Sequence, residues 1–252
     1  LEHRRQRQMC IRDSLRGVEI PTHCKKNSCS LLWRRRVRRR VTSIAMEPIA
    51  AVCAAGFLIA ILAHVFLVPP PHIKRPEPML LGSLTFLTVQ SNLVCYYYSF
   101  MRLLAPDGEI VRLLYPLAFS LGVMLTLLYY SLDHFVNAKQ AEDRLWIKKG
   151  WTWIPIANHL EHAHALPLML LDAARSAHAA TTDAEIYVVC GGYIGFYLVV
   201  TLLQKRIHGA WVYPVYDEAV AAAGPIGFWL IALPVVGAVL GLGFVARGVG
   251  AT

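Results

Sequence analysis

LLYPLAFSLGVMLTLLYYSL, residues 113–132, is a stretch of 20 residues without a charged side chain. A helix rises about 1.5 Å per residue, so roughly 20 apolar residues cross the ~30 Å hydrocarbon core of a bilayer. Tyr129 and Tyr130 lie near the end of the stretch, where interfacial aromatic residues are common. The stretch therefore predicts a transmembrane helix that ends in an interfacial aromatic pair.

Five other stretches share this length and apolar character: residues 49–67, 79–101, 153–171, 186–203 and 224–246. Hydrophobic residues make up 56% of the chain and charged residues 16%, and the mean hydropathy is +0.45. This composition is too apolar for a soluble domain. The stretches lack the apolar–polar alternation of membrane strands, so helices are expected. We predict an all-α polytopic membrane bundle of about six transmembrane helices within residues 46–252.

The first 45 residues differ from the rest of the chain in charge. They hold 13 Lys or Arg and 3 Asp or Glu, a net charge of +10, whereas residues 46–252 hold 12 and 13, a net charge of −1. The tail has no apolar periodicity, so we expect residues 1–45 to be disordered, or to be translated sequence upstream of a start at Met46. The alternative is a basic arm that binds anionic lipid headgroups. Since the basic excess is confined to the tail, no nucleic-acid partner is expected.

The stretch 153–171 carries ionisable residues inside its apolar sequence. Such a residue at membrane depth costs at least about 2.5–3.5 kcal/mol and usually faces a bundle interior or a cavity. At about 100° per residue, one helix face carries three polar residues: Asn158, His159 and His162. Glu161 flanks this face, whereas His164 points elsewhere. Pro155 and Pro167 bracket the cluster and are expected to open backbone groups toward the cavity.

The stretch 79–101 carries a matching polar stripe: Thr85, Thr88, Ser91 and Asn92. Two helices that each present a polar face predict a shared pocket, although such side chains also join helices by hydrogen bonds alone. A His beside a hydroxyl supports acyl transfer, in which the imidazole takes the proton and the oxygen forms a covalent acyl intermediate. Clustered His could instead bind a metal or a haem, but most of these lie on one helix. His64 stands alone in the first stretch, and we expect it to be a packed core or interfacial residue.

Three segments agree in order and spacing with a known family: LGSLTFLT at residues 81–88, NHLEH at 158–162 and WVYP at 211–214. Together they resemble the androgen-induced gene 1 family, which includes the androgen-dependent tissue-factor-pathway-inhibitor-regulating protein. The run TVQSN at residues 88–92 looks more like the microbial branch of that family. The resemblance extends over residues 46–246, which is the whole predicted bundle.

The resemblance implies a multi-pass membrane threonine hydrolase that cleaves fatty acid esters of hydroxy fatty acids. It aligns the nucleophile of the family with Thr88, and with Thr85 if a two-residue gap is allowed. The catalytic His of the family aligns with His162, so His159 or Glu161 would orient the imidazole. Three side chains are candidates to donate to the oxyanion: Asn92, Ser91 and Asn158.

The expected partners are membrane lipids and a lipid ester substrate, and no cofactor is implied. Lipid enzymes of this kind are expected in the endoplasmic reticulum or the plasma membrane. A non-enzymatic lipid-binding or transport protein and a haem-binding membrane protein are the alternative hypotheses, since both would use the same polar pocket. The side of the membrane that holds the termini depends on whether the basic tail is native.

Overall fold

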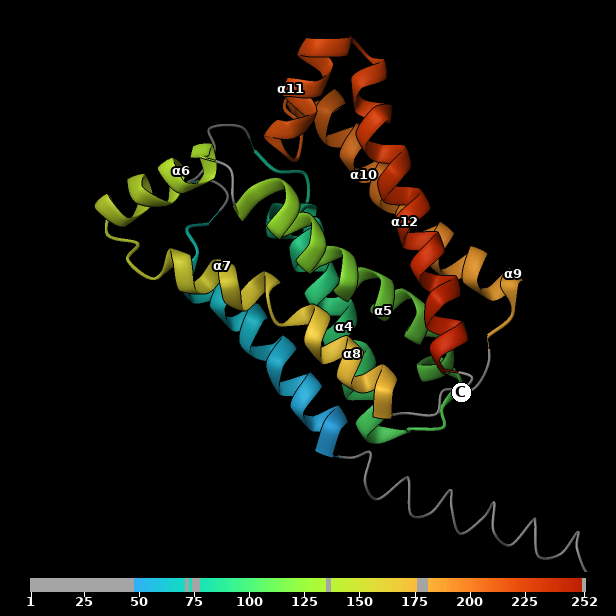
Figure 1. Ribbon diagram of the computed structural model, residues 1–252. Coiled ribbons are helices and arrows are strands. Elements are labelled where there is room, and N and C mark those ends of the chain that lie inside the picture. The colour runs from blue at the N-terminus through green and yellow to red at the C-terminus, as the bar shows by residue number, and fades with distance from the viewer. Residues whose placement is uncertain (1–47, 71–72, 74–77, 135–136, 176–180, 251–252) are drawn as a thin grey trace, which may run out of the picture. The chain divides into compact units, whose positions relative to one another are not determined.

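The computed structural model describes residues 48–70, 73, 78–134, 137–175 and 181–250 (Figure 1). Every regular element within these ranges is helical. The predicted all-α class is therefore confirmed for the part of the chain that is described. The predicted tail, residues 1–45, lies outside the described residues.

The elements follow one another from the N-terminal to the C-terminal end of the described chain. The first half contains the first helix Pro48–Leu67, the 3₁₀ turn η1 Gly82–Thr85, α4 Leu87–Leu104, α5 Glu109–Leu128, the π-helical turn η2 Tyr129–His134 and α6 Asn137–Lys148. The second half contains α7 Ile154–His162, α8 Ala165–Arg175, α9 Asp183–Ile186, the π-helical turn η3 Tyr187–Gly191, α10 Gly192–His208, α11 Pro214–Ala223 and α12 Ile226–Gly250.

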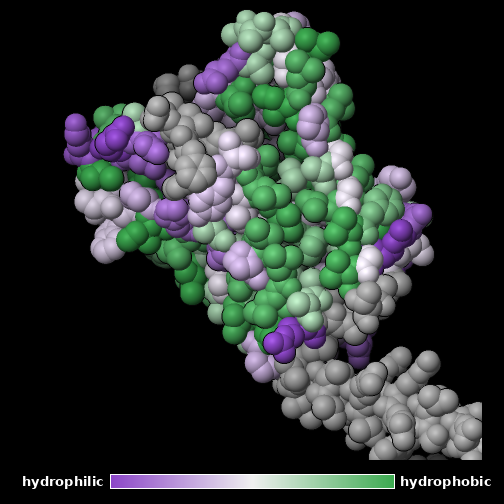
Figure 2. All heavy atoms as spheres, in the orientation of Figure 1, coloured by the Kyte–Doolittle hydropathy of each residue, from purple (hydrophilic) through white to green (hydrophobic). Residues whose placement is uncertain are grey.

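Four helices are long and apolar enough to cross a membrane: Pro48–Leu67, Glu109–Ser131, Asp183–His208 and Ile226–Val249. In the first, third and fourth of these, only 22–33% of the apolar window is buried inside the protein. Helices this apolar and this exposed are stable in lipid, which solvates their side chains and leaves their backbone hydrogen bonds intact. Figure 2 shows apolar side chains over the middle of the viewed face and hydrophilic side chains at α6 and α9. The chain is therefore an integral membrane protein.

The other two predicted spans, residues 79–101 and 153–171, are not continuous helices. Residues 79–101 form η1 before α4 begins at Leu87. Gly82, with a φ of 57°, prevents a regular helix before η1, and Phe86, with a φ of −82° and a ψ of 132°, is extended between η1 and α4. Residues 153–171 divide into α7 and α8 at residues 163 and 164. Pro167 is the reason, since its ring clashes with the carbonyl four residues earlier and it lacks an N–H.

Helix α5 lies at the centre of the packing. Within its apolar window 72% is buried, and it packs against α4, α8 and α12. Gly122 allows α8 to approach closely, since a Cβ there would lie 2.6 Å from Met169 Cγ. Gly56 does the same for the first helix, where a Cβ would lie 2.5 Å from Leu168 Cδ1. Small residues at such crossings are typical of membrane helices, and here they hold α8 and the preceding α7 in place.

The segment WVYP connects α10 to α11. Gly209, with a φ of 75°, ends α10, and Pro214 begins α11, as is usual for these residues at helix ends. The Trp211 ring stacks on the Phe228 ring at a centroid distance of 4.7 Å. This packing fixes the connection, and Tyr213 extends from it to the N-terminus of α4, where its hydroxyl accepts a hydrogen bond from the Leu87 amide at 3.0 Å.

Candidate active site

One hydroxyl and one imidazole meet between α4 and α7. Thr88 Oγ1 lies 3.2 Å from His162 Nε2. Thr88 is the second residue of α4 and His162 is the last residue of α7, so each side chain is held at a helix end. The sequence predicts that these two polar faces meet, and the contact is present. Thr85 Oγ1 instead accepts a hydrogen bond from the Leu81 amide within its own turn, at 3.0 Å.

The hydrogen bonds of His162 determine which of its nitrogens can act as a base. Its Nδ1 lies 2.7 Å from the carbonyl oxygen of Asn158. A carbonyl only accepts, so Nδ1 carries the proton and Nε2 of the neutral imidazole carries the lone pair. The Thr88 hydroxyl must therefore donate to Nε2. A general base needs this arrangement before it takes the proton of a hydroxyl nucleophile.

The Tyr129 ring fixes the plane of the imidazole. The two rings stack with a centroid distance of 4.1 Å and an interplanar angle of 15°. Tyr129 is the first residue of the π-helical turn η2 and is only 5% exposed. The sequence predicts an interfacial aromatic pair at the end of this stretch, and in the structure the π-helical turn directs the Tyr129 ring inward onto His162. Such turns are frequent at functional sites.

Thr126 of α5 fills the break between α7 and α8. In a continuous helix the Leu166 amide would donate to the His162 carbonyl. Here Thr126 Oγ1 accepts from the Leu166 amide at 3.1 Å and donates to the His162 carbonyl at 2.5 Å. A side chain inserted into an open helical hydrogen bond is an established cause of a kink. The inserted hydroxyl fixes the backbone that carries the imidazole.

The N-terminus of α4 provides positive electrostatic potential beside Thr88. The first amides of a helix have no intrahelical acceptor and carry the positive end of its dipole. No side chain of the preceding residue caps α4, and the Tyr213 hydroxyl accepts from the Leu87 amide instead. Burial raises the pKa of Tyr213, and hydrogen bonds that involve Leu87, Tyr197 and Thr88 oppose part of this rise. The Tyr213 hydroxyl therefore stays protonated near neutral pH, with a proton to donate beside Thr88.

Asn92 and Ser91 lie on the buried side of α4. Asn92 Nδ2 donates to the carbonyl oxygens of Thr88 and Glu161, each at 3.0 Å. One of these bonds returns to the backbone of α4 and the other joins α4 to α7, so Asn92 positions the two segments and has no proton left for an oxyanion. Ser91 Oγ is buried without a hydrogen-bond partner among the described residues.

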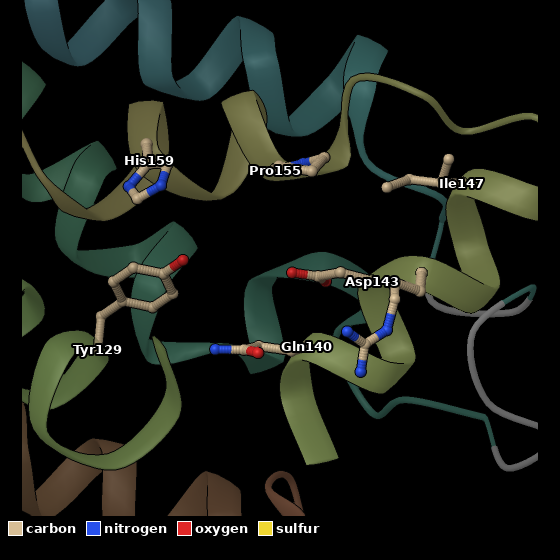
Figure 3. A pocket seen from close by; sticks show the side chains of 7 residues that line it. Tyr129, Gln140, Asp143, Ile147, Pro155 and His159 are labelled. Carbon is tan, nitrogen blue, oxygen red and sulfur yellow. The ribbon is translucent and has the colours of Figure 1, made fainter. Parts of the chain in front are cut away.

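Asn158 and His159 face α6 and the turn η2. Asn158 Nδ2 donates to both carboxylate oxygens of Asp143, at 3.2 and 3.1 Å, while its carbonyl orients His162. His159 is exposed, and its Nδ1 lies 3.1 Å from the Tyr130 hydroxyl. Figure 3 shows His159 at one end of a cavity of about 280 Å³, which Tyr129 and Asp143 also line. The imidazole of His162 is therefore oriented by a backbone carbonyl and an aromatic ring.

Glu161 is directed to the first helix instead of His162. Its Oε2 lies 3.2 Å from His64 Nδ1, and the residue is 5% exposed. His64, expected as a packed residue, is thus the partner of Glu161. His164 packs edge-on against Phe57 at a centroid distance of 5.1 Å, away from the Thr88–His162 contact.

A comparison with protein families shows to which family the chain belongs. The FAR-17a/AIG1-like protein family matches residues 82–246, a range that holds the α4, α7 and WVYP segments of the site. This chain belongs to the FAR-17a/AIG1-like protein family. The resemblance drawn from the three sequence segments is thereby confirmed. Comparisons with curated proteins and with solved structures gave no match.

Several contacts in this FAR-17a/AIG1-like chain were not predicted from the sequence. Thr126 and Tyr129 lie in the uncharged stretch 113–132, where one hydroxyl and one aromatic ring are ordinary. Their spacing of three residues, which gives them one shared helix face, is the only sequence feature that could have marked them. Tyr213 belongs to a family segment, but nothing in that segment indicates contact with α4. Among the described residues, no group of three or more His, Cys, Asp or Glu side chains is placed to hold a metal ion.

Proposed function

We propose that this protein is an intramembrane hydrolase of lipid esters, with Thr88 as nucleophile and His162 as general base. The observation that carries the proposal is the 3.2 Å contact between Thr88 Oγ1 and His162 Nε2, with the Nδ1 proton held by the Asn158 carbonyl. The proposed substrates are fatty acid esters of hydroxy fatty acids. Family membership and the apolar surroundings of the site support this substrate class.

The proposed architecture is a bundle of six membrane-crossing segments. Four are the long apolar helices, and we add α4 and the broken pair α7–α8. α4 packs against the central helix α5, and α8 packs against the same helix. A nucleophile and a base would then come from the two less regular segments, where polar groups at membrane depth find protein partners. The endoplasmic reticulum or the plasma membrane is the proposed location.

In the acylation step, Thr88 Oγ1 attacks the ester carbonyl carbon and His162 Nε2 takes the hydroxyl proton. The carbonyl oxygen becomes an oxyanion, which the positive end of the α4 dipole and the Tyr213 hydroxyl would stabilise. When the tetrahedral intermediate collapses, the C–O bond to the leaving alcohol breaks and His162 returns its proton to that alcohol. The acyl group remains as an ester on Thr88.

In the deacylation step, a water molecule replaces the alcohol. His162 Nε2 takes a proton from the water, whose oxygen attacks the acyl carbon, and the Thr88 oxygen leaves with that proton. The products are a carboxylic acid and the regenerated hydroxyl. The cavity that Tyr129 lines is also lined by Asp143 and Arg144 of α6 and by His159 of α7. This cavity would supply the water.

The experiment that tests this proposal combines ester hydrolysis with covalent labelling by a fluorophosphonate probe. Thr88→Ala and His162→Ala should each abolish hydrolysis, and the double variant should be no worse, since residues that act as a unit are not additive. Thr88→Ser retains the hydroxyl and should keep part of the activity. His164→Ala, whose ring faces Phe57, is the matched imidazole control and should keep most of it.

The alternative functions predict different results. A lipid-binding or transport protein would neither label with the probe nor cleave any ester, and Thr88→Ala would change only stability. A haem protein would show an intense Soret band after purification. Either result would overturn the hydrolase proposal.

A further inference from the structure

Helix α6 lies at the surface of the membrane. It begins six residues after Ser131, where the span Glu109–Ser131 ends, and six residues reach at most about 20 Å. The helix packs against α7 and against η2, which continues that span, and Figure 1 shows it at one edge of the bundle. Five of its 12 residues are charged, which excludes it from the hydrocarbon core. Helix α6 therefore lies at the level of the lipid headgroups.

Both carboxylates of α6 take part in hydrogen bonds within the protein. Asp143 accepts from Asn158 Nδ2 on both oxygens, at 3.2 and 3.1 Å. Glu142 Oε1 accepts from Trp146 Nε1 at 3.3 Å. Trp146 is only 5% exposed. Asp143 and Trp146 thus mark the inner side of the helix, and the opposite side faces the surroundings.

Three cations are exposed on α6 or directly after it: Arg144, Lys148 and Lys149. None of them forms an ion pair with a carboxylate of the residues that the structure describes. Arg144 and Lys148 are four residues apart, so they lie on one helix face. Lys149 Nζ lies 4.3 Å from the centre of the Trp146 ring. The three cations are therefore open to an anion from outside the protein.

Apolar side chains are exposed beside these cations. Leu145 is 49% exposed, and Trp153, directly before α7, is 59% exposed. Trp is enriched at the boundary between headgroups and acyl chains. A helix surface that combines Lys or Arg with exposed apolar residues is typical of helices that bind anionic membranes. A lipid surface fits both kinds of side chain, whereas an acidic soluble partner fits only the cations.

The charge of this segment differs from that of another segment between two spans. Residues 137–153 hold four Lys or Arg and two Asp or Glu, a net charge of +2. Residues 204–223, from the end of α10 through α11, hold two and two, a net charge of zero. Lys205 of that segment is paired with Asp217 at 3.3 Å. The positive potential of this pair of segments is therefore concentrated at α6.

We infer that α6 binds the headgroups of anionic phospholipids, a role that goes beyond the proposed hydrolysis. The lipid phosphates accept hydrogen bonds from Arg144, Lys148 and Lys149, as phosphates do from Arg and Lys elsewhere. Leu145 and Trp153 pack against the upper part of the acyl chains. Each basic residue beside an anionic membrane strengthens binding about fivefold, so three of them hold α6 firmly on the surface.

The test compares hydrogen exchange of the full chain in two kinds of nanodisc. One contains phosphatidylcholine alone, and in the other part of this lipid is replaced by phosphatidylglycerol with the same acyl chains, so only the headgroup differs. The amides of α6 should exchange several-fold more slowly with phosphatidylglycerol, because bound headgroups suppress local opening of the helix. Equal exchange of α6 in the two nanodiscs, which is also the result expected for an acidic protein partner, would overturn the inference.

A double substitution and a matched control assign the effect to α6. Lys148→Gln with Lys149→Gln removes two of the three cations, and the dependence of α6 exchange on phosphatidylglycerol should be largely lost. Lys205→Gln with Arg206→Gln removes the same charge from α10 and should retain that dependence. Since each protein is compared with itself in two lipids, a change in overall stability does not mimic the result. A dependence that survives the first pair of substitutions, or that is lost equally with the second, would contradict the assignment.

This inference and the hydrolase proposal can fail separately. Thr88→Ala removes the proposed nucleophile, yet α6 should still exchange more slowly in nanodiscs that contain phosphatidylglycerol. A Thr88→Ala protein without this dependence would contradict a lipid-binding role of α6 that is independent of hydrolysis.

Discussion

Thr126→Val tests whether the break between α7 and α8 positions the base. Valine has nearly the same shape as threonine but lacks the hydroxyl that bridges the His162 carbonyl and the Leu166 amide. Thr126 is 7% exposed, so water would have little access to the two groups. A buried group that loses its partner costs about 1–3 kcal/mol, so two of them cost about 2–6 kcal/mol if neither finds another.

The break also offers a route to relieve this cost. The Leu166 amide can donate directly to the His162 carbonyl if the backbone at residues 163 and 164 tightens, while Pro167 still keeps α7 and α8 from forming one regular helix. That movement would shift His162 relative to Thr88, and a misplacement of about 1 Å can reduce a rate about 100-fold. We therefore expect Thr126→Val to lose stability, activity or both, and Thr126→Ser, which keeps the hydroxyl, to lose little of either.

The assay measures the thermal unfolding midpoint in detergent together with the rate of fluorophosphonate labelling. Labelling reports the Thr88–His162 geometry without the need to know the natural substrate. If Thr126→Val keeps the midpoint and the labelling rate of the native protein, Thr126 does not position His162.

Three other substitutions test separate contacts. Tyr213→Phe removes a proposed oxyanion donor and should reduce kcat about 10²–10³-fold, and an unchanged kcat in the ester hydrolysis assay would exclude this role. Asp172 forms a buried ion pair with Arg102, and Asp172→Asn removes the charge of this partner. The protein should lose about 3–5 kcal/mol of stability, measured as a lower unfolding midpoint. An unchanged midpoint would show that the pair contributes nothing. Gly122→Leu forces a side chain into Met169 and should destabilise by about 1–3 kcal/mol, whereas Gly241→Leu, where a Cβ meets nothing within 4 Å, should leave the midpoint unchanged.

The pairing of Thr88 with His162 could be predicted because each lies on a polar face of an apolar segment. Helical periodicity puts such residues on one side, and the cost of polar groups in lipid directs that side toward protein. The resemblance to the family segments then singled out Thr88 and His162 among the polar residues of the two faces. The position of Thr85, whose hydroxyl accepts from the Leu81 amide, needed the structure, because it depends on the turn before α4 begins.

The details that orient the imidazole could not be predicted from the sequence. They are contacts between residues far apart in the chain, such as Tyr129 on His162 and Thr126 at the helix break. Threonine and tyrosine are both common in transmembrane helices, so their residue types did not mark them as part of a site. The sequence also assigned Glu161 and Asn92 to the site, whereas Glu161 pairs with His64 and Asn92 uses its amide protons on two carbonyls. Adjacent positions on a helix point in different directions, so proximity in sequence to His162 did not imply contact.

The most direct test of the central claim is to identify the residue that becomes covalently modified. The purified protein is treated with a fluorophosphonate, digested and analysed by peptide mass spectrometry. We predict one adduct on Thr88 Oγ1, lost in His162→Ala and retained in His164→Ala. An adduct on Thr85 or another hydroxyl, or a fully folded protein without any adduct, would contradict the assignment of Thr88 as the nucleophile.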